Sequence, residues 1–402
     1  MSRPALVKLL DVTTVRSALA AHARFLDGRS GGVRANFSHA DLSNFELDGV
    51  DLSDAELTGA RLGGAILSNA KLDRAVLFGA DLRDADLRRA SLHRADLRGA
   101  CLRGANLAGA DLAECDLREG MIALQDVTQG FRILKHEKRA GELDFAVLSG
   151  ASLKGAQMAG AMACATDFSD ADLSGAQLGG ARLCNAMLDG ANLSNAQLFQ
   201  TDFTGASMKR AVLVGCNIAD ATVDKGALDD TLRAPPPIFY IDDQPLGAVL
   251  DAHEAWCDSD GKEGVAGRLA EVDFRPLRRL AERQLTALIA PGSVFFGMDM
   301  KAAQLQGSDL TGADLRSTDL RGADLRGARL RDAQLNRADL RGAKMGPLPI
   351  MEGRLVRTDF SRAVLRHADL RGADVRRARF LDADVDGARF DGANMEGAEL
   401  EV

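Results

Sequence analysis

Apolar residues return at every fifth position over long stretches of this chain. The first series spans Phe37–Ile122, the second Leu143–Leu228 and the third about Met300–Leu400. A period of five fits neither the 3.6 residues of a helical turn nor the alternation of an ordinary strand. It predicts a backbone that turns a corner every five residues, so that four pentapeptides complete one coil.

The residue types within each five-residue unit explain how such coils would pack. A large side chain, usually Leu, fills the interior, and a small residue, most often Ala, stands two positions earlier, beside the corner. Stacked coils would pair their backbones at the cross-strand spacing of about 4.8 Å. Each buried Leu contributes roughly 1.5–3 kcal/mol before conformational entropy is counted. The pattern therefore predicts an all-β solenoid.

Two of the clearest units are Ala80-Asp81-Leu82-Arg83-Asp84 and Ala323-Asp324-Leu325-Arg326-Gly327. They resemble the A-(D/N)-L-x-x motif of the pentapeptide repeat family, and the resemblance extends over most of the chain. It implies the fold of that family, a right-handed quadrilateral β-helix. It implies much less about function, because a fold alone does not determine one.

Interruptions of the period divide the chain into six segments. From the N-terminus these are a capping-helix segment (1–34), a first array (35–124), an interrupting loop (125–140), a second array (141–230), a segment with a proline linker, a helix and degraded repeats (231–297), and a third array (298–402). The sequence leaves open whether the first two arrays form one continuous solenoid.

Two short helices with similar sequences are predicted outside the arrays. One spans about Thr14–Leu26, and the other starts at Asp242-Asp243 and ends before Asp260-Gly261. When the two are aligned, His22 matches His253, and an aromatic residue follows each histidine three positions later. We expect these helices to cap open coil ends. We expect the histidines to pack inside rather than bind a metal, because no second ligand stands at a fixed spacing.

Composition and charge narrow the classes of function. No apolar stretch is long enough to span a membrane, and a formal net charge of −8 argues against direct nucleic-acid binding. The six cysteines show no C-x-x-C spacing and the N-terminus has no export signal, so a cytoplasmic protein with reduced thiols is expected. No catalytic, cofactor or metal motif is recognisable, which makes an enzyme the least favoured class.

Positions 20 apart stack on one face of such a solenoid, so the sequence also predicts its surface. One column of the second array carries only amides, which can hydrogen-bond along the axis, and Phe199 points outward beside it. This uncharged face and the interrupting loop are the candidate protein contacts, and the alternative for both is ordinary solvated surface. The candidate residues are Gln157, Gln177, Gln197, Asn217 and Phe199 on the face, and Phe131, Arg132 and Lys135 in the loop.

Two further columns carry chemistry. In the third array a column of aspartates is predicted beside a column of basic residues, so that opposite charges offset each other. Cys164 and Cys184, also 20 apart, are predicted to be neighbours, and a reducing compartment would leave both as free thiols. The charged columns are Asp299, Asp319, Asp339 and Asp359, and Lys301, Arg321 and Arg341.

These features favour a non-catalytic scaffold that presents rigid faces and loops to an unidentified protein partner, without a cofactor. The family resemblance implies an alternative, since some pentapeptide repeat proteins mimic DNA and bind type II topoisomerases such as gyrase, giving quinolone protection. The charge-balanced third array and the uncharged amide column argue against it. We also hypothesise a homodimer through the C-terminal coil, because no helix is predicted to cap it. Otherwise the final strand folds over its own end.

Overall fold

The structure, a computed structural model, is organised as two compact units, Met1–Ala234 and Pro235–Val402, each with its own hydrophobic core. Among the residues described, no helix is both long and apolar enough to cross a membrane. The described residues are 8–128, 131–235, 238–350 and 353–400, with the backbone alone described at 8–9, 122–128 and 131–136.

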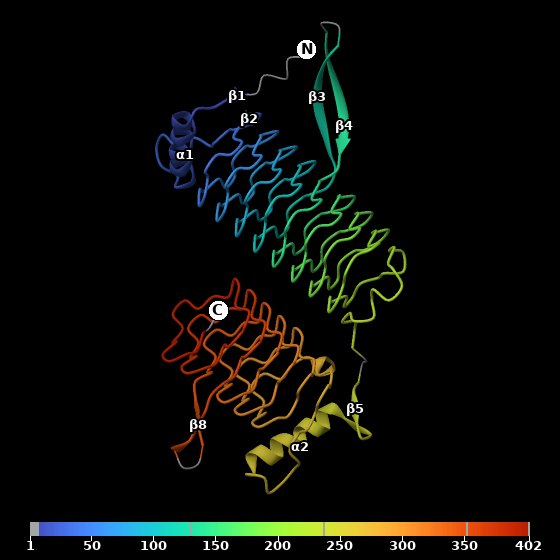
Figure 1. Cartoon of the computed structure of the whole chain (residues 1–402), viewed down its shortest axis with the longest axis vertical. Coiled ribbons are helices and arrows are strands. Elements are labelled where there is room, and N and C mark those ends of the chain that lie inside the picture. Colours follow the sequence, from blue (N-terminus) through green and yellow to red (C-terminus); the bar gives the residue numbers. More distant parts are fainter. Residues whose placement is uncertain (1–7, 129–130, 236–237, 351–352, 401–402) are drawn as a thin grey trace. The chain divides into compact units, whose positions relative to one another are not determined.

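The first unit is a stack of coils in which one residue of each pentapeptide pairs with a residue of the next turn (Figure 1). Parallel bridges join positions 20 apart, as in Arg61↔Asp81 and Asp81↔Cys101, so one turn takes four pentapeptides. The backbone N–H of Leu62 donates to the carbonyl of Asp81 at 2.7 Å, and that of Asp81 donates to Ala60 at 2.9 Å. Leu62 and Ala60 are fully buried. The period of five is therefore the period of the buried positions.

Helix α1 (Val12–Leu26) precedes the first coil and covers one end of its core. Asp11 caps the helix by accepting the backbone N–H of Thr14 at 2.6 Å, and Val15 is buried against the core. Strand β1 (Lys8–Leu9) pairs in parallel with β2 (Ala40–Asp41). α1 and β1 therefore supply apolar cover and backbone partners to the first coil.

Between the first two arrays, where an interrupting loop was predicted, the structure has a β-hairpin. Strands β3 (Gly120–Thr128) and β4 (Phe131–Arg139) pair in antiparallel register and project from the stack (Figure 1). The coils resume beyond the hairpin, where Asp116 pairs with Gln157, and one core runs through both arrays. The two arrays therefore form a single solenoid. The first array ends before β3, so Ile122 of the predicted series lies in the hairpin.

The second unit begins with a short hairpin and a helix. Its elements are β5 (Tyr240–Ile241), β6 (Gln244–Pro245) and α2 (Leu246–Asp258). Asp242 and Asp243, predicted to start the helix, instead form the turn of the hairpin with φ of 45° and 61°. The helix therefore begins only after Pro245. Leu246 and Leu250 are buried in the core of this unit, so α2 covers it as predicted.

The coils of the second unit start earlier than the predicted boundary at residue 298. Parallel bridges already join Arg268 to Ile289 and Asp273 to Val294. A single turn of 3₁₀ helix, η1 (Arg275–Leu277), adds one residue to these first turns and breaks the period of five in the sequence. The segment expected to hold degraded repeats is therefore part of the regular stack.

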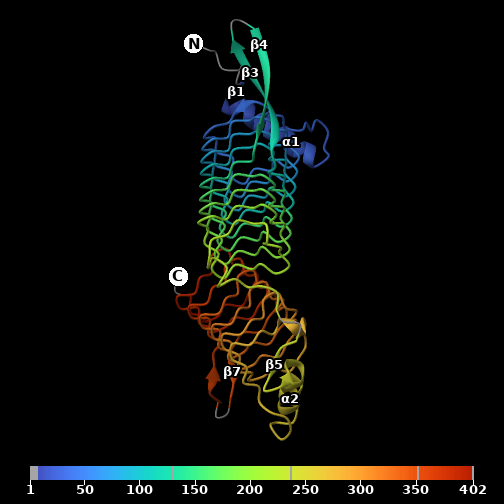
Figure 2. The same ribbon diagram turned by 90° about the vertical axis from the view of Figure 1, so that its right-hand side faces the viewer.

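A second interruption, not recognised from the sequence, lies within the third array (Figures 1 and 2). It is a short hairpin of β7 (Leu348–Pro349) and β8 (Leu355–Val356). Because of this insertion, Arg329 pairs with Asp359, and Asp339 pairs with Asp369. The predicted aspartate column therefore continues at Asp369, and the assignment of Asp359 to that column was wrong.

Candidate functional site

The predicted amide column lies on one side of the first unit, here called the amide face. Gln157, Gln177 and Gln197 are joined by successive parallel bridges, and the last two are exposed. In the described structure no side-chain hydrogen bond links the three amides, so the column is held by its backbone and the predicted amide ladder is not formed. Asn217 is also exposed, but no bridge joins it to Gln197 in this part of the chain.

Phe199 lies beside this column with 58% of its surface exposed. The next residue, Gln200, has φ of 54°, so the backbone turns the corner directly after the ring. The preceding turns carry Ala159 and Gly179 at the same position. The backbone of Phe199 is fixed from its neighbour turn, because the N–H of Gly180 donates to its carbonyl at 2.8 Å. The result is a rigid, uncharged strip from which one aromatic ring projects.

The same face carries charge in the turns before the amide column. Arg98 lies 2.7 Å from Asp96, and Arg118 lies 2.7 Å from Asp116, each measured between a guanidinium nitrogen and a carboxylate oxygen. Asp116 then pairs with Gln157 through the backbone. The surface therefore changes from paired charges to neutral amides at Gln157, so a partner would meet two chemically different halves of one face.

The loop candidates lie on strand β4. In its antiparallel register Phe131 pairs with Thr128, Arg132 with Val127 and Lys135 with Leu124. The side chains of the three candidates fall outside the described part of the structure. At the root of the hairpin, Lys138 Nζ lies 3.0 Å from Glu119 Oε1, and Arg139 Nε donates to Glu142 Oε1 at 3.3 Å. These ion pairs fasten the base of the hairpin to the coils.

Cys164 and Cys184 are joined by a disulfide, which corrects the expectation of two free thiols. The bridge between Met162 and Arg182 places the cysteines in adjacent turns, with their Cα atoms 4.6 Å apart. That separation lies within the range of roughly 4.4–6.8 Å over which disulfides form. The backbone N–H of Cys164 donates to Asp144 Oδ1 at 2.8 Å. The side of the coils that carries Asp144, Cys164 and Cys184 is called the cysteine face below.

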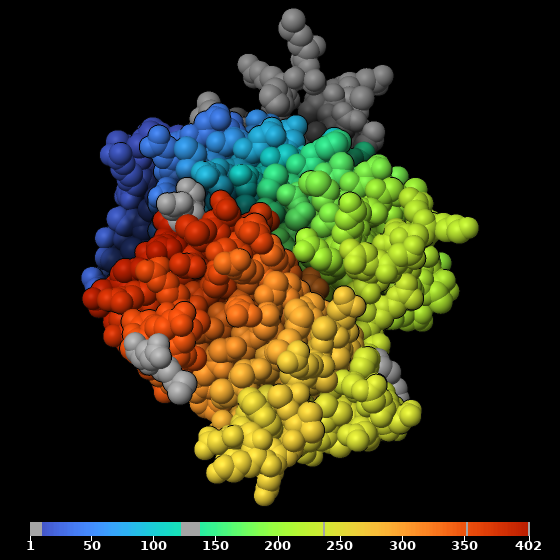
Figure 3. Space-filling view, turned by 60° about the horizontal axis from the view of Figure 1, so that its bottom comes forward, coloured from blue at the N-terminus to red at the C-terminus, as the bar shows by residue number. Residues whose placement is uncertain are grey.

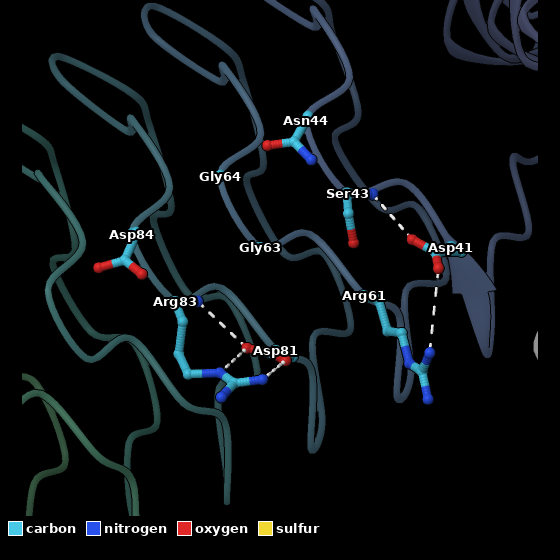
Figure 4. A pocket seen from close by; sticks show the side chains of 9 residues that line it. All are labelled: Asp41, Ser43, Asn44, Arg61, Gly63, Gly64, Asp81, Arg83 and Asp84. Carbon is cyan, nitrogen blue, oxygen red and sulfur yellow. Dashed lines mark hydrogen bonds and ion pairs between the residues drawn. The ribbon is translucent and has the colours of Figure 1, made fainter. Parts of the chain in front are cut away.

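A shallow recess on the cysteine face was missed by the sequence reasoning (Figure 4). It has a volume of about 600 Å³ and lies where Gly63 and Gly64 carry no outward side chain, which was the only signal in the sequence. Arg83 donates to Asp81 through Nε at 2.8 Å and Nη2 at 2.6 Å, and these bonds lower the pKa of Asp81. Since Arg61 faces Asp41 and Arg83 faces Asp81, the recess is a polar surface whose two basic groups are paired with carboxylates of its own lining. Its lining is Asp41, Ser43, Asn44, Arg61, Gly63, Gly64, Asp81, Arg83 and Asp84.

In the second unit, opposite charges alternate along one face. Arg321 lies 2.6 Å from Asp319 and 3.6 Å from Asp339, and Arg341 likewise lies 2.7 Å from Asp339 and 3.7 Å from Asp369. The hydrogen bond from Arg321 lowers the pKa of Asp319. Figure 3 shows side chains packed closely over this unit (yellow to red), without a deep opening on the face in view. Among the described residues, no group of three or more His, Cys, Asp or Glu is placed to hold a metal ion.

The family model for pentapeptide repeats matches eight segments of this chain, which together cover more than half of it. The matches lie in both units and leave out the two capping helices and the β3–β4 hairpin. The matched segments are 33–69, 70–109, 100–119, 142–176, 166–205, 191–225, 308–346 and 358–397.

Several solved structures are similar to this chain. HetL, a pentapeptide repeat protein involved in heterocyst differentiation regulation from the cyanobacterium Nostoc sp. strain PCC 7120, is 22% identical over 97% of this chain and 95% of its own, with a TM-score of 0.20. QnrB1, a plasmid-mediated fluoroquinolone resistance protein, is 18% identical over 50% of this chain and 87% of its own, with a TM-score of 0.23. Rfr23, from the cyanobacterium Cyanothece 51142, is 21% identical over 33% of this chain and 86% of its own, with a TM-score of 0.20. A search of curated proteins found no match. At these TM-scores the similarities carry no argument about function.

Proposed function

This chain belongs to the pentapeptide repeat family, and we propose that it is a non-catalytic scaffold that presents rigid β-helix faces and its β3–β4 hairpin to a protein partner. We further infer that the coils have the right-handed, four-sided form of that family, and the 20-residue spacing of the bridges supports the four sides. The proposal includes a cytoplasmic location, which fractionation of the native cells would test.

The observation that carries this proposal is the exposed ring of Phe199 beside the uncharged amide column of the amide face. An aromatic side chain removes roughly 150–250 Å² of surface from water when it becomes buried, and aromatic residues are enriched among the energetically dominant residues of interfaces. The ring stands on a backbone that is hydrogen-bonded to the next turn, so binding would require little ordering of the scaffold. The neighbouring amides can donate and accept hydrogen bonds without the desolvation of a charge.

The proposal is tested by replacing Phe199 and comparing the proteins that bind the full chain. Phe199→Asp puts a charge where the ring projects, and the coil should still fold because the side chain points away from the core. Phe145→Asp is the matched control, since Phe145 is also an exposed aromatic, 61% accessible, on the cysteine face. Tagged wild type and both variants are used for affinity capture from the native cells, with quantitative mass spectrometry.

We expect at least one protein to be captured by the wild type and by Phe145→Asp, and to be lost with Phe199→Asp. Direct binding of that protein is then measured with purified components, where Phe199→Asp should weaken affinity about tenfold or more. If purified Phe199→Asp binds every captured protein as the wild type does, the amide face is not the contact. Deletion of the hairpin then tests the second candidate, which includes Phe131, Arg132 and Lys135.

A second candidate function is a DNA-mimicking protein that binds or protects a type II topoisomerase. The net charge of −8 and the recurrent outward aspartates favour it. Against it, many of these aspartates are paired with arginines, as Asp81 is with Arg83 and Asp319 with Arg321. A supercoiling assay with gyrase, with and without this protein and a quinolone, separates the two functions. A scaffold without this partner leaves supercoiling and quinolone inhibition unchanged, whereas a change in either would support the second candidate.

A further inference from the structure

The two disulfide-bonded cysteines differ from the other four in what surrounds their sulfur atoms. Both lie on the cysteine face and are only half-buried. Cys216 and Cys257 are half-buried as well, so the difference lies in the contacts of the sulfurs. The sulfurs of Cys101, Cys216 and Cys257 contact Glu142 at 3.2 Å, the carbonyl of Leu193 at 2.8 Å and the carbonyl of Thr286 at 3.5 Å, whereas the carbonyl of Arg182 lies 3.9 Å from the sulfur of Cys164. Cys115 is fully buried. Burial raises the pKa of all four free thiols, so their reactive thiolate forms are disfavoured.

The backbone around the pair is held by hydrogen bonds that do not depend on the disulfide. The N–H of Ala163 donates to Arg182, and that of Ala165 donates to Cys184, both at 2.8 Å. The turn that carries Cys184 is bonded in the same way to the following turn, through Leu183 and Asp202 at 2.8 Å. The stacking of turns therefore holds the two cysteines one turn apart whether or not their sulfurs are bonded. Opening the disulfide leaves these contacts in place, and closing it again needs no large movement.

We propose that Cys164 and Cys184 form a thiol–disulfide exchange site on the cysteine face, which external thiols reduce and oxidants reoxidise while the coils stay folded. The ligand class is a thiol or dithiol, either a small molecule such as glutathione or a protein with paired cysteines. Accessible disulfides are generally the labile ones. A site of this kind is compatible with a reducing compartment, because its thiols can be present there as the free pair.

The exchange reaction balances without any other reactant. The thiolate of an external dithiol attacks one cysteine sulfur, the Cys164–Cys184 bond breaks, and the other cysteine leaves as a thiolate. The second external thiol, once deprotonated, attacks the resulting mixed disulfide and releases the first cysteine. Two electrons pass to the cysteine pair, the external dithiol becomes a disulfide, and its two protons end on Cys164 and Cys184. Reoxidation by an external disulfide follows the same steps in reverse.

The surroundings of the pair show what its oxidation state would change. The carbonyl of Cys164 accepts the backbone N–H of Phe145 at 3.1 Å. Phe145, whose ring is exposed, therefore lies in the turn next to the one that carries Cys164. Asp144 lies on the opposite side of Cys164 from Cys184 and accepts the N–H of Cys164. Reduction therefore replaces one apolar disulfide by two thiols on a surface that already carries an aromatic ring and a carboxylate.

The test uses the full chain in its native state. Protein purified in air is alkylated with N-ethylmaleimide after unfolding, and mass spectrometry of the peptides assigns each cysteine. We expect four alkylated cysteines and a Cys164–Cys184 disulfide. The folded protein is then incubated with dithiothreitol or with reduced glutathione, quenched with acid at intervals and alkylated. We expect dithiothreitol to reduce the disulfide at least about tenfold faster than the chain unfolds in the same buffer, with the far-ultraviolet circular dichroism unchanged.

The two reductants and a single variant distinguish the source of the thiol. In Cys184→Ser the thiolate of the remaining Cys164 should attack oxidised glutathione and release one reduced glutathione, which leaves a stable mixed disulfide seen as its added mass, while Cys164→Ser/Cys184→Ser forms none at these positions. Reduction of the wild type by glutathione identifies a small thiol as sufficient, whereas reduction by dithiothreitol alone identifies a dithiol. The proposal is overturned if all six cysteines of air-purified protein are free, or if the disulfide is reduced only when the coils unfold.

Discussion

Two buried histidines hold the capping helices against their first coils. His22 Nδ1 accepts the backbone N–H of Ala35 at 3.1 Å, and His253 Nδ1 accepts that of Gly267 at 2.9 Å. Each ring also stacks on the aromatic residue three positions later, with ring centroids 5.7 and 5.8 Å apart. Because a ring nitrogen that accepts a hydrogen bond cannot carry a proton, both histidines must be neutral in this arrangement. The packing role expected from the sequence thus has a specific form, a hydrogen bond to the residue that opens each stack.

The histidines make each cap sensitive to acid. Burial lowers the pKa of His22 and of His253 below 6.5, although carboxylates near each one, such as Asp51 and Glu254, favour the charged form. Asp54 also favours the charged form of His22, and Arg34 opposes it. The unfolded chain therefore binds protons near pH 6.5 that the folded chain does not bind. The contribution of the two histidines to the free energy of unfolding is therefore fully present above pH 6.5, and it is lost as the pH decreases below that value.

We predict that His22→Asn makes the first unit lose less stability when the pH is lowered. The asparagine carbonyl can accept the N–H of Ala35 but does not titrate, so the decrease in unfolding free energy between pH 7 and pH 5 should become smaller. His22→Leu should instead cost about 1–3 kcal/mol at both pH values, because the amide of Ala35 loses its partner. Urea unfolding at the two pH values measures both effects. Equal pH dependence in wild type and His22→Asn would contradict the assignment.

Phe145 adopts a backbone conformation that its side chain disfavours. Its φ is 63°, at a corner position where the preceding turns on the same face carry Asn44, Gly64, Asp84 and Gly104. A bulky residue in this left-handed region costs roughly 1–2 kcal/mol. Part of this cost is offset by a cation–π contact, because the guanidinium of Arg103 lies 6.0 Å from the centroid of the Phe145 ring.

We predict that Phe145→Gly stabilises the first unit by about 1 kcal/mol, since glycine adopts positive φ without strain. The urea midpoint should rise with an unchanged slope. Leu143→Gly is the contrasting variant, because Leu143 is fully buried in the core and its loss should lower the midpoint strongly. A lower midpoint for Phe145→Gly would mean that the ring contributes more packing than the strain costs.

At the scale of elements, the β3–β4 hairpin is an insertion into an otherwise continuous stack. The turn before it ends at Glu119, and the turn after it resumes with Gly141, which is buried where other turns place alanine. Removing residues 120–140 would join these two positions and restore the 20-residue spacing between bridged residues. The core positions on both sides, Leu117 and Leu143, would then stand five residues apart like their neighbours.

We therefore predict that deletion of residues 120–140 leaves the first unit folded. Circular dichroism and the thermal midpoint should stay close to those of the full chain, since the turns on both sides of the hairpin are already bridged to each other, as Cys101 is to Glu142. Deletion of residues 121–140 is the matched control, because the one extra residue breaks the five-residue spacing between Leu117 and Leu143 at a junction that has no 3₁₀ turn to accommodate it. The control should unfold at a clearly lower temperature. Equal loss in both deletions would show that the hairpin is needed for folding.

The sequence predicted the repeating part of the fold because each repeat carries its own constraint. A coil interior accepts only the residues that fit its sides and corners, so Leu62 and Ala60 mark buried positions wherever they recur. The amide column and the proximity of Cys164 and Cys184 followed from the same spacing. The form and exact bounds of the interruptions could not be predicted in this way, since they depend on where the backbone re-enters the stack.

Three particular segments show this limit. Ile122 falls on the fifth position yet lies in β3, where its backbone pairs with β4 instead of with a neighbouring turn. The 3₁₀ turn at Arg275–Leu277 conceals the first coils of the second unit, and the β7–β8 insertion moved Asp359 to another face. The disulfide depended on oxidation state, which the spacing of cysteines does not contain.

At the scale of the whole molecule, the last described coil of the second unit differs from those before it. The core positions Leu365 and Leu370 are fully buried, whereas the corresponding Val385 and Phe390 are only partly buried. Met395 and Leu400 are each 37% exposed. The strand there continues the ladder, because the N–H of Glu399 donates to Ala378, so within the described residues it does not fold back over the coil. Apolar side chains of a coil interior are thus open to solvent at this end.

From this open coil we predict that the protein forms a dimer in which two copies cover each other's exposed end. A second copy presents the same apolar surface and the same unpaired strand edges, which a two-fold axis can match. Multi-angle light scattering should give twice the 42.7 kDa mass of the chain at micromolar concentration. Met395→Asp should shift the protein toward the single-chain mass. Met187→Asp should not, because Met187 is a 47% exposed methionine on the side of the first unit. A mass of one chain for the wild type throughout this range would exclude the dimer, and equal dissociation by both variants would place the interface elsewhere.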